Sequence, residues 1–335
     1  MRILKRIILI LLLFTIFLSS AIGYFAMRPL NISTLPATFT LAKGISLGGA
    51  TQYLQKIGIL GDSMDGRIFA WVGRILGMST QIKAGNYQLQ ISPSILELLN
   101  LVSKGQAIQS QISIIEGWTF NQLRDSFNVN PDIRHDTLGL SDEDILQQLG
   151  LSGKHAEGLF FPDTYYFTSG TSDLVLLQQA QQTMQKHLKA NWATRSLNLP
   201  LSTPYQALIL ASIVEKETGQ ADDRDMIAGV FINRLKIGMK LQTDPTVIYG
   251  MGKTFNGNLR RRDLLQDTPY NTYTRYGLPP SPIALPGLAS LQAVMHPAKT
   301  KALYFVSRGD GSSEFSSTLR NHNNAVNRHQ KCCKK

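Results

Sequence analysis

The chain has 335 residues, of which 43% are hydrophobic and 17% are charged. This length suggests about two folded units, and this composition excludes an intrinsically disordered protein. The formal net charge of +11 fits an anionic membrane surface or a polyanionic substrate as well as nucleic acid. The sequence has no helix-turn-helix signature, zinc-finger spacing or RNP motif, so we expect no nucleic-acid partner.

The first 30 residues, MRILKRIILILLLFTIFLSSAIGYFAMRPL, predict a membrane-spanning helix. Three cations lie within residues 1–6, and residues 7–27 carry no charge. At about 1.5 Å per residue, that uncharged run just spans a hydrocarbon core of roughly 30 Å. The alternative is a signal peptide with residues 7–18 as its apolar region and a cut after Ser19 or Ala21. We favour a retained anchor because the apolar run continues further, and the basic cluster then leaves residues 1–6 in the cytoplasm and the body outside.

Residues 36–108 have the pattern of a small α+β module. A short strand and a glycine turn precede a helix with Tyr53, Leu54 and Ile57 on its apolar stripe, and a second helix covers residues 68–76. The stretch KAGNYQLQISPSILELLNLVSKG then predicts a strand, a helix start at Ser-Pro and an amphipathic helix.

Residues 109–327 indicate a second region of mixed helices and strands. Alternation over residues 112–115 predicts a strand, a helix opens at Thr119, and a long polar helix covers about residues 174–192. The last third contains several loops rich in Gly, Pro, Tyr and Asn, namely LQTDPTVIYGMG, TPYNTYTRYGLPPSPIALPG and VMHPAKTKALYFVSRG. Loops of this composition often build a functional site on a scaffold.

One further helix carries two glutamates at its end, in the segment ASIVEKETG. Thr203 can cap its start, Pro204 suits the first helical position, Gln206 can close a capping box, and Gly219 ends the helix. Glu217 shares its helix face with an aliphatic set, Val214, Ile213 and Leu210. The other glutamate, Glu215, shares its face with a less apolar set, Ser212, Ala211 and Leu208.

Helix phase therefore predicts that Glu217 lies against hydrocarbon. Desolvation and the negative end of the helix dipole would both raise the pKa of its carboxyl. A carboxyl that is neutral near pH 7 can serve as a general acid. The alternatives are a solvated side chain beside Lys216 and an ion pair with Arg224 or Arg234.

The remaining polar residues suggest no cofactor and no metal. The sequence lacks His/Cys/carboxylate spacing for a metal, a G-x-S-x-G elbow and a phosphate loop. Both cysteines, Cys332 and Cys333, are adjacent in the basic tail, residues 328–335, and a thiol-free body suits an oxidising compartment. Asp244 precedes a proline and is typical of a turn cap, while Arg234 on an amphipathic helix is typical of a structural clamp.

Carboxyls, amides and tyrosines are the groups that bind and cleave carbohydrates. A glycosidase ordinarily uses two carboxylates, whereas the residues here single out one. Several long segments in order, among them ASIVEKETG, VFINRLKIGMKLQTDPTVIYGMG, YNTYTRYGLPPSPIALPG and HPAKTKALYFVSRGDG, closely resemble the endolytic murein transglycosylase (YceG-like) family. The resemblance extends upstream through EGLFFPDTYYF and KAGNYQL to the N-terminal anchor.

The resemblance implies a single-pass inner-membrane enzyme with a LysM-like module and a YceG-type catalytic domain in the periplasm. Such enzymes cleave the MurNAc-β-1,4-GlcNAc bond within nascent peptidoglycan strands, leave 1,6-anhydroMurNAc ends, set strand length and work beside cell-wall synthases, the penicillin-binding proteins. The family's catalytic glutamate falls on Glu217, which acts as acid and then as base without consuming water. The resemblance assigns a further set of residues to the substrate groove: Glu157, Gln242, Asp244, Asn271 and Tyr273.

Three points stay open at this stage. Ser281 stands where the family commonly has glycine, and a positive φ at that position would strain the loop modestly. A lysozyme-like muramidase is one rival function, with Asp244 or Glu157 as its second carboxylate. A non-catalytic peptidoglycan-binding membrane protein is the other.

Overall fold

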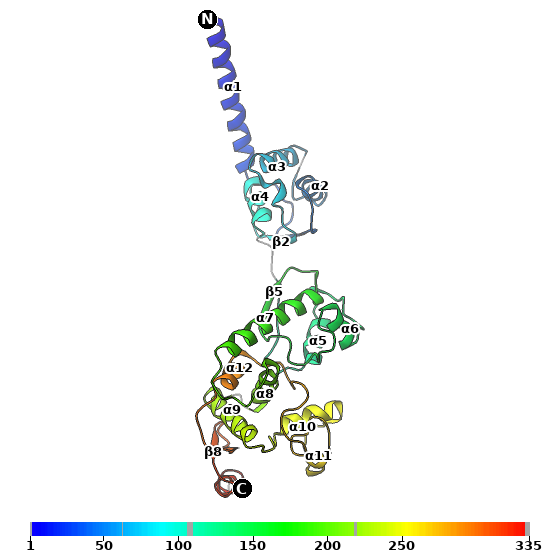
Figure 1. Cartoon of the computed structure of the whole chain (residues 1–335). Helices are drawn as coiled ribbons and strands as arrows, with labels where there is room; N and C mark the ends of the chain where they lie inside the picture. The colour runs from blue at the N-terminus through cyan, green and yellow to red at the C-terminus, as the bar shows by residue number, and fades with distance from the viewer. Residues whose placement is uncertain (1, 62, 106–109, 218–219, 332–335) are drawn as a thin grey trace. The chain divides into compact units, whose positions relative to one another are not determined.

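The computed structural model shows a mixed helix-and-strand protein (Figure 1). It describes most of the chain, namely residues 2–61, 63–105, 110–217 and 220–331. The predicted helix end at Gly219 and the adjacent Cys332 and Cys333 lie outside these described residues.

Two compact units divide the chain. The first holds residues 1–110 and 166–170, and the second holds residues 111–165 and 171–335. Each unit has a hydrophobic core of its own, so the fold of each follows from its own sequence pattern.

The first helix, α1 (Arg2–Met27), is the one helix in the described residues that is long and apolar enough to cross a membrane. Its stretch Arg6–Met27 has a mean hydropathy of 2.5, and the most apolar part of it packs against nothing else in the protein. A 22-residue helix rises about 33 Å at 1.5 Å per residue, which matches the thickness of a bilayer core.

Directly after α1 the chain is fixed to the body of the first unit. The Arg28 guanidinium forms an ion pair with Asp65 at 2.7 Å, and the Leu30 N–H donates to the Pro93 carbonyl at 2.9 Å. The helix therefore enters the first unit without an intervening flexible segment.

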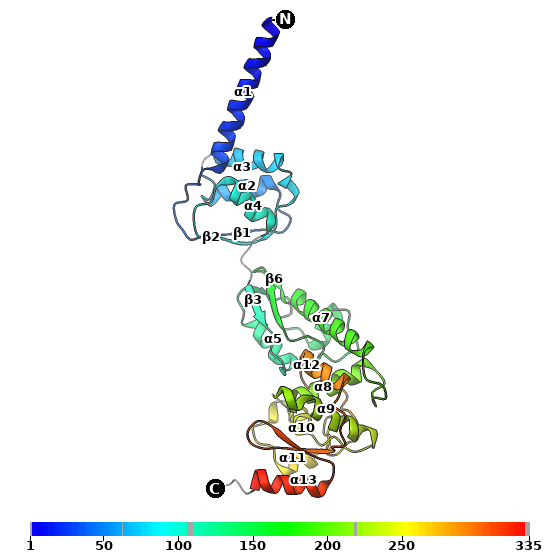
Figure 2. The same cartoon turned by 90° about the vertical axis from the view of Figure 1, so that its left-hand side faces the viewer.

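The body of the first unit is a two-stranded sheet covered on one side by helices (Figure 2). The sheet pairs β1 (Ala37–Leu41) with β2 (Gly85–Leu89) antiparallel, and places Phe39 opposite Tyr87 in the core. The helices are α2 (Leu47–Lys56), α3 (Ser63–Ile75) and α4 (Ile95–Lys104), with a short 3-10 turn at Met78–Thr80.

Local sequence signals account for these elements, with one error. Ser94 caps α4 and forms a capping box with Glu97, so the helix begins two residues after the predicted Ser-Pro start at Ser92 and Pro93. Ile57, by contrast, follows α2 as its C-cap and is 40% exposed, so the predicted apolar stripe is wrong there. The helix instead buries Leu47, Ala50, Thr51 and Leu54.

The second unit begins with short strands and three helices. Its elements are β3 (Ser110–Ser113), α5 (Phe120–Asn128), β4 (Ile133–Arg134), α6 (Asp142–Gln148), β5 (Thr164–Phe167), β6 (Thr171–Ser172) and α7 (Asp173–Ala193). The cap at Thr119 is confirmed, because its hydroxyl accepts the Gln122 N–H. In return, the Thr119 N–H donates to the side-chain oxygen of Gln122. β4 and β6 pair parallel, with Ile133 opposite Thr171.

The core of this unit is made by α8 (Pro204–Glu217), α9 (Ala221–Lys236) and α12 (Leu288–Met295), which pack side by side (Figure 2). Around them lie α10 (Asp244–Met251), a 3-10 turn (Gly252–Thr254) and α11 (Arg261–Leu265). A hairpin of β7 (Tyr304–Ser307) and β8 (Ser313–Ser316) is followed by α13 (Leu319–Val326) and a π-helical turn (Asn327–Lys331).

Candidate active site

The helix that carries the two glutamates is buried around its whole circumference. All eight residues from Ala207 to Val214 are buried, so the less apolar face that Glu215 shares with Ser212 is buried as well. Thr203 caps the helix by accepting from the Gln206 N–H at 3.2 Å. The Gln206 side chain accepts from the Ser202 N–H instead of closing the predicted box on Thr203.

The two glutamates differ in their partners. Glu215 accepts the N–H of Gly287 at 2.9 Å and so fixes the start of α12. Glu217, at the last position of α8, accepts a hydrogen bond from the Thr243 hydroxyl and lines a cavity of about 600 Å³. The two side chains therefore differ because Glu217 lines this cavity and Glu215 does not, and not because of their phase on the helix.

Burial raises the pKa of the Glu217 carboxyl to about 7. The charge of Asp244 acts in the same direction, while the bond from Thr243 and the charge of Arg234 lower the pKa. Within the described ranges Glu217 forms no ion pair, so the predicted alternative of a pair with Arg224 or Arg234 is wrong. A carboxyl with this pKa is present in both protonation states at neutral pH.

Two loops that are distant in sequence form one wall of the cavity. The Tyr273 hydroxyl donates to the Asp244 carboxylate at 2.5 Å, and the Thr243 N–H donates to the Thr272 hydroxyl at 3.1 Å. Gln242 has a φ of 48°, a left-handed conformation that is uncommon for a residue with a side chain. Three of the predicted groove residues, Gln242, Asp244 and Tyr273, therefore line the same cavity as Glu217.

Arg234 of α9 supports this wall and also lines the cavity. Its Nε donates to the Leu303 carbonyl at 2.6 Å and its Nη1 to the Leu241 carbonyl at 2.7 Å, so its predicted role as a structural clamp is confirmed. It is 7% exposed and lies 5.2 Å from the ring centroid of Tyr304. Its charge is close enough to Glu217 to favour the carboxylate.

A further wall of the cavity comes from β7, within the segment VMHPAKTKALYFVSRG singled out in the sequence, and from α13, which the sequence did not reveal. His322 stacks on Tyr304 with 5.2 Å between ring centroids, and both line the cavity. The Nδ1 atom of His322 is buried and has no hydrogen-bond partner among the described residues. A lone histidine in the segment NHNNA gives no periodic or motif signal, so only the fold could find it.

Glu157 does not belong to the lining of this cavity. It is 4% exposed, and its carboxylate accepts the Phe120 N–H at 2.9 Å and the Tyr249 hydroxyl at 3.1 Å. Burial raises its pKa to about 7, because these two hydrogen bonds only partly offset the loss of water. Its contacts are those of a residue that holds the start of α5 against α10.

Asn271 is close to the cavity but has no free polar atom to offer it. It is fully buried, and its amide nitrogen donates to three backbone carbonyls, those of Asp263, Leu264 and Gln266. Its oxygen accepts the Tyr273 N–H at 2.8 Å. The structure thus corrects the expected substrate contact: Asn271 shapes the loop that presents Tyr273.

Ser281 causes no backbone strain. It is absent from the described residues with positive φ, so the condition under which serine would strain the loop is not met. It is 1% exposed, its hydroxyl lies 2.6 Å from the Tyr270 hydroxyl, and it donates to the Pro282 carbonyl at 2.9 Å. The Ser281 hydroxyl therefore forms two buried hydrogen bonds that a glycine at this position could not form.

Together the fold and the site define a mixed helix-and-strand protein with one partly buried carboxyl at a helix end, facing a polar and aromatic groove. The chain belongs to the YceG-like family, whose pattern matches residues 39–328.

Several known proteins are similar to it. An endolytic murein transglycosylase of Bacillus subtilis is 40% identical over 169 residues, which cover 50% of this chain and 46% of that protein. The protein of the same name from Streptococcus pneumoniae is 29% identical over 362 aligned residues, covering 94% of this chain and 64% of the relative. This chain thus spans about half to just under two thirds of the length of these relatives.

A solved structure supports the fold assignment. The crystal structure of a yceG-like protein from Listeria monocytogenes aligns with a TM-score of 0.54 at 28% identity. The alignment covers 87% of this chain and 99% of that one.

Proposed function

We propose that this chain is an endolytic peptidoglycan transglycosylase that cleaves the MurNAc-β-1,4-GlcNAc bond and leaves 1,6-anhydroMurNAc ends. The observation that carries the proposal is the pKa of about 7 for Glu217, in a cavity that also holds Tyr273 and Gln242. Membership of the YceG-like family and the names of the relatives support the same reaction.

In this mechanism a single carboxyl moves one proton in each direction. Protonated Glu217 donates to the glycosidic oxygen as the C1–O bond breaks, and GlcNAc leaves with a free 4-hydroxyl. The Glu217 carboxylate then accepts the proton of the MurNAc C6 hydroxyl as that oxygen bonds to C1. The acid is regenerated without water, and the charge of Arg234 stabilises the carboxylate between the two steps.

The aromatic and amide groups of the groove suit sugar binding. Tyr273 and Tyr304 line the cavity, and so does Gln242, which is exposed and has a left-handed backbone conformation. A cavity of about 600 Å³ is within the range of small-ligand sites. We assign Gln242, Asp244 and Tyr273 to contacts with the glycan.

One observation keeps hydrolysis as a second candidate. Asp244 lines the same cavity as Glu217, and a muramidase ordinarily uses two carboxyl groups at the bond that it cleaves. Glu157 is not in that cavity, so it is the weaker partner for such a reaction. The products separate the two reactions, because hydrolysis leaves a reducing MurNAc end that is one water heavier.

The test is mass analysis of the muropeptides released from uncrosslinked glycan strands by the full chain. We expect anhydro ends from the wild type and at least a 100-fold slower reaction from Glu217→Gln, because the amide cannot donate the proton. Glu215→Gln is the matched control on the same helix, and it should keep the wild-type rate. Reducing ends would refute transglycosylation. Full activity of Glu217→Gln would refute the catalytic role of Glu217, and a wild type that releases no muropeptides would favour a binding protein.

We further propose a place in the cell for each part of the chain. Residues 7–27 anchor the protein in the inner membrane with residues 1–6 in the cytoplasm, and the direct junction at Arg28 favours an anchor over a cleaved leader. Residues 36–108 form a LysM-like module, residues 109–327 form the periplasmic catalytic domain, and residues 328–335 form a basic tail. Protease accessibility in spheroplasts tests this topology, since residues 1–6 and the membrane segment 7–27 should be protected and the rest of the chain should be cleaved.

The proposed partners are nascent glycan strands and the synthases that make them. A strand-cutting enzyme anchored in the membrane would meet its substrate as a penicillin-binding protein extends it. Crosslinking in cells, with Glu217→Gln to trap the substrate-bound state, should recover a synthase; recovery equal to that of an unrelated single-pass protein would count against this partnership.

A further inference from the structure

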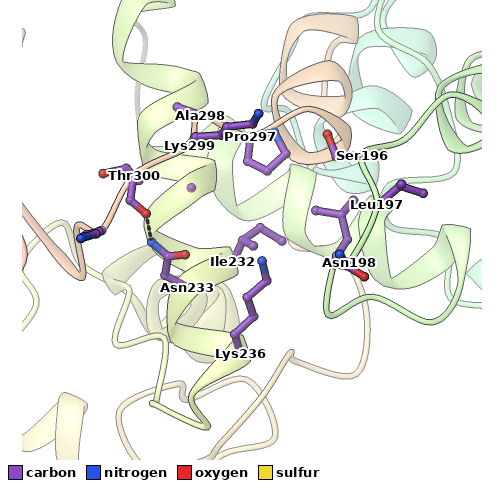
Figure 3. A pocket seen from close by; sticks show the side chains of 13 residues that line it. Ser196, Leu197, Asn198, Ile232, Asn233, Lys236, Pro297, Ala298, Lys299 and Thr300 are labelled. Carbon is purple, nitrogen blue, oxygen red and sulfur yellow. Dashed lines mark hydrogen bonds between the residues drawn. The ribbon is translucent and has the colours of Figure 1, made fainter.

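A second cavity, of about 500 Å³, lies beside α9 (Figure 3). Gly229, Ile232, Asn233 and Lys236 are spaced three and four residues apart, so they present one face of the helix to it. Arg234 lies off that face and lines the Glu217 cavity instead. The same helix therefore contributes to two separate cavities.

The floor of the second cavity includes a strap, residues 296–303, that is held tightly to α9. A Cβ on Gly229 would lie 2.8 Å from the Ala298 carbonyl oxygen, so the glycine is what allows the strap to approach. The Asn233 side chain donates to the carbonyls of Thr300 at 2.8 Å and Ala302 at 3.1 Å; the first of these bonds is drawn in Figure 3. The strap therefore projects its side chains from a fixed backbone.

The opposite rim is the loop of residues 196–199, which is also fixed. The Ser196 N–H donates to the Met295 carbonyl at 2.8 Å, and Asn198 has a left-handed φ of 64°. In Figure 3 the Lys236 side chain extends from α9 into the space between Ile232 and Asn198.

The cavity is strongly basic. Lys236, Lys299 and Lys301 line it, and its other lining residues include no aspartate or glutamate. Among the described residues none of these three lysines forms an ion pair. Three lysines around one hollow, with no acidic residue in its lining, make a site for an anion, and ammonium groups bind carboxylates as point charges.

We propose that this cavity, the lysine cavity, binds the carboxylates of the peptide stems on the glycan strand. The inference rests on the proposed function, because the strap runs directly into β7, whose Tyr304 lines the Glu217 groove. A polymer seated in the groove with acidic side branches would thus find the lysine cavity next to it. A hollow bounded by α9, the strap and the loop of residues 196–199 fits a short acidic branch better than the flat face of an anionic membrane.

The test measures binding, not cleavage. The full chain in neutral detergent is titrated with a synthetic acidic stem tetrapeptide and with the same peptide whose carboxylates are converted to amides. The test variant combines Lys236→Gln, Lys299→Gln and Lys301→Gln. The control removes the same charge from exposed lysines outside the cavity, with Lys186→Gln, Lys189→Gln and Lys253→Gln.

We expect the acidic peptide to bind the wild type and the control variant, and the test variant to bind it at least about tenfold more weakly. The amidated peptide should bind all three proteins equally poorly. Equal losses in the two triple variants, or no preference for the acidic peptide, would overturn the proposal. Lysine-dependent binding of phosphatidylglycerol vesicles without peptide binding would also overturn it and assign the lysines to the membrane.

This outcome is separable from that of the catalytic proposal. Glu217→Gln should keep the peptide affinity of the wild type, because Glu217 is not in the lysine cavity. A wild type that binds the peptide but cleaves no strand would refute catalysis alone. If the wild type cleaves strands but the triple lysine variant binds the peptide as well as the wild type does, only the proposed role of the lysine cavity is refuted.

Discussion

The hydrogen bond from Thr243 to Glu217 gives a prediction with a defined sign. The side chain of Thr243 is 2% exposed, and its hydroxyl lowers the pKa of Glu217 by stabilising the carboxylate. Thr243→Val keeps the shape of the side chain and removes the donor. The pKa of Glu217 should therefore rise above its value of about 7.

The size of this rise follows from the strength of the bond. A hydrogen bond to a charged group contributes roughly 1.5 to 3 kcal/mol, and one pKa unit corresponds to about 1.4 kcal/mol. Because water can replace part of the lost bond in a cavity that is open to solvent, we expect a rise of about one unit. At pH 8 the protonated fraction of Glu217 would then increase from about 10% to about 50%, a roughly fivefold change.

The assay is the rate of muropeptide release from uncrosslinked strands between pH 5 and pH 10. The alkaline limb of the profile should move about one unit to higher pH in Thr243→Val. Thr51→Val, which removes a buried hydroxyl from the first unit, is the control and should leave the limb in place. An alkaline limb that stays in place in Thr243→Val, or moves to lower pH, would refute the assignment of Glu217 as the acid.

Three further results are expected. Asp244→Asn removes a charge that raises the pKa of Glu217, so the alkaline limb should move by less than one unit to lower pH; complete loss of activity would instead favour the muramidase. Glu217→Gln should raise the free energy of unfolding at pH 8 by up to about 3 kcal/mol but not at pH 4. The folded state keeps the proton up to about pH 7, whereas the unfolded state loses it near the ordinary glutamate pKa of about 4.5; equal urea midpoints at pH 8 would contradict this. Gly229→Ala should lower the unfolding free energy by roughly 1 to 3 kcal/mol, measured by urea denaturation, because its Cβ would meet the backbone oxygen of Ala298; unchanged stability would show that the strap moves freely.

Elements with strong local signals were predictable from the sequence. The starts of α4 and α5 follow from caps at Ser94 and Thr119, since a capping box involves only neighbours in the chain. The apolar helix of residues 2–27 follows from composition alone. These features need no knowledge of tertiary structure.

The site was predictable only in part, because its walls are built by contacts between distant segments. The burial of Glu217 and its raised pKa were correctly predicted, but the predicted hydrocarbon surroundings were not, because Glu217 faces a cavity lined by polar residues such as Arg234 and Asp244. The side chain of Asn271 is hydrogen-bonded to the backbone of its own loop, and these bonds depend on the fold of residues 263–273. His322 reaches the cavity only because α13 packs back against β7.

The junction after α1 has a mechanical consequence. The ion pair of Arg28 with Asp65 and the backbone bond from Leu30 leave no slack between the helix and the first unit. Membrane helices tilt to match the thickness of the bilayer around them. If α1 crosses a bilayer, each change of tilt will swing the first unit as a lever, and lipid thickness will set its angle to the membrane surface.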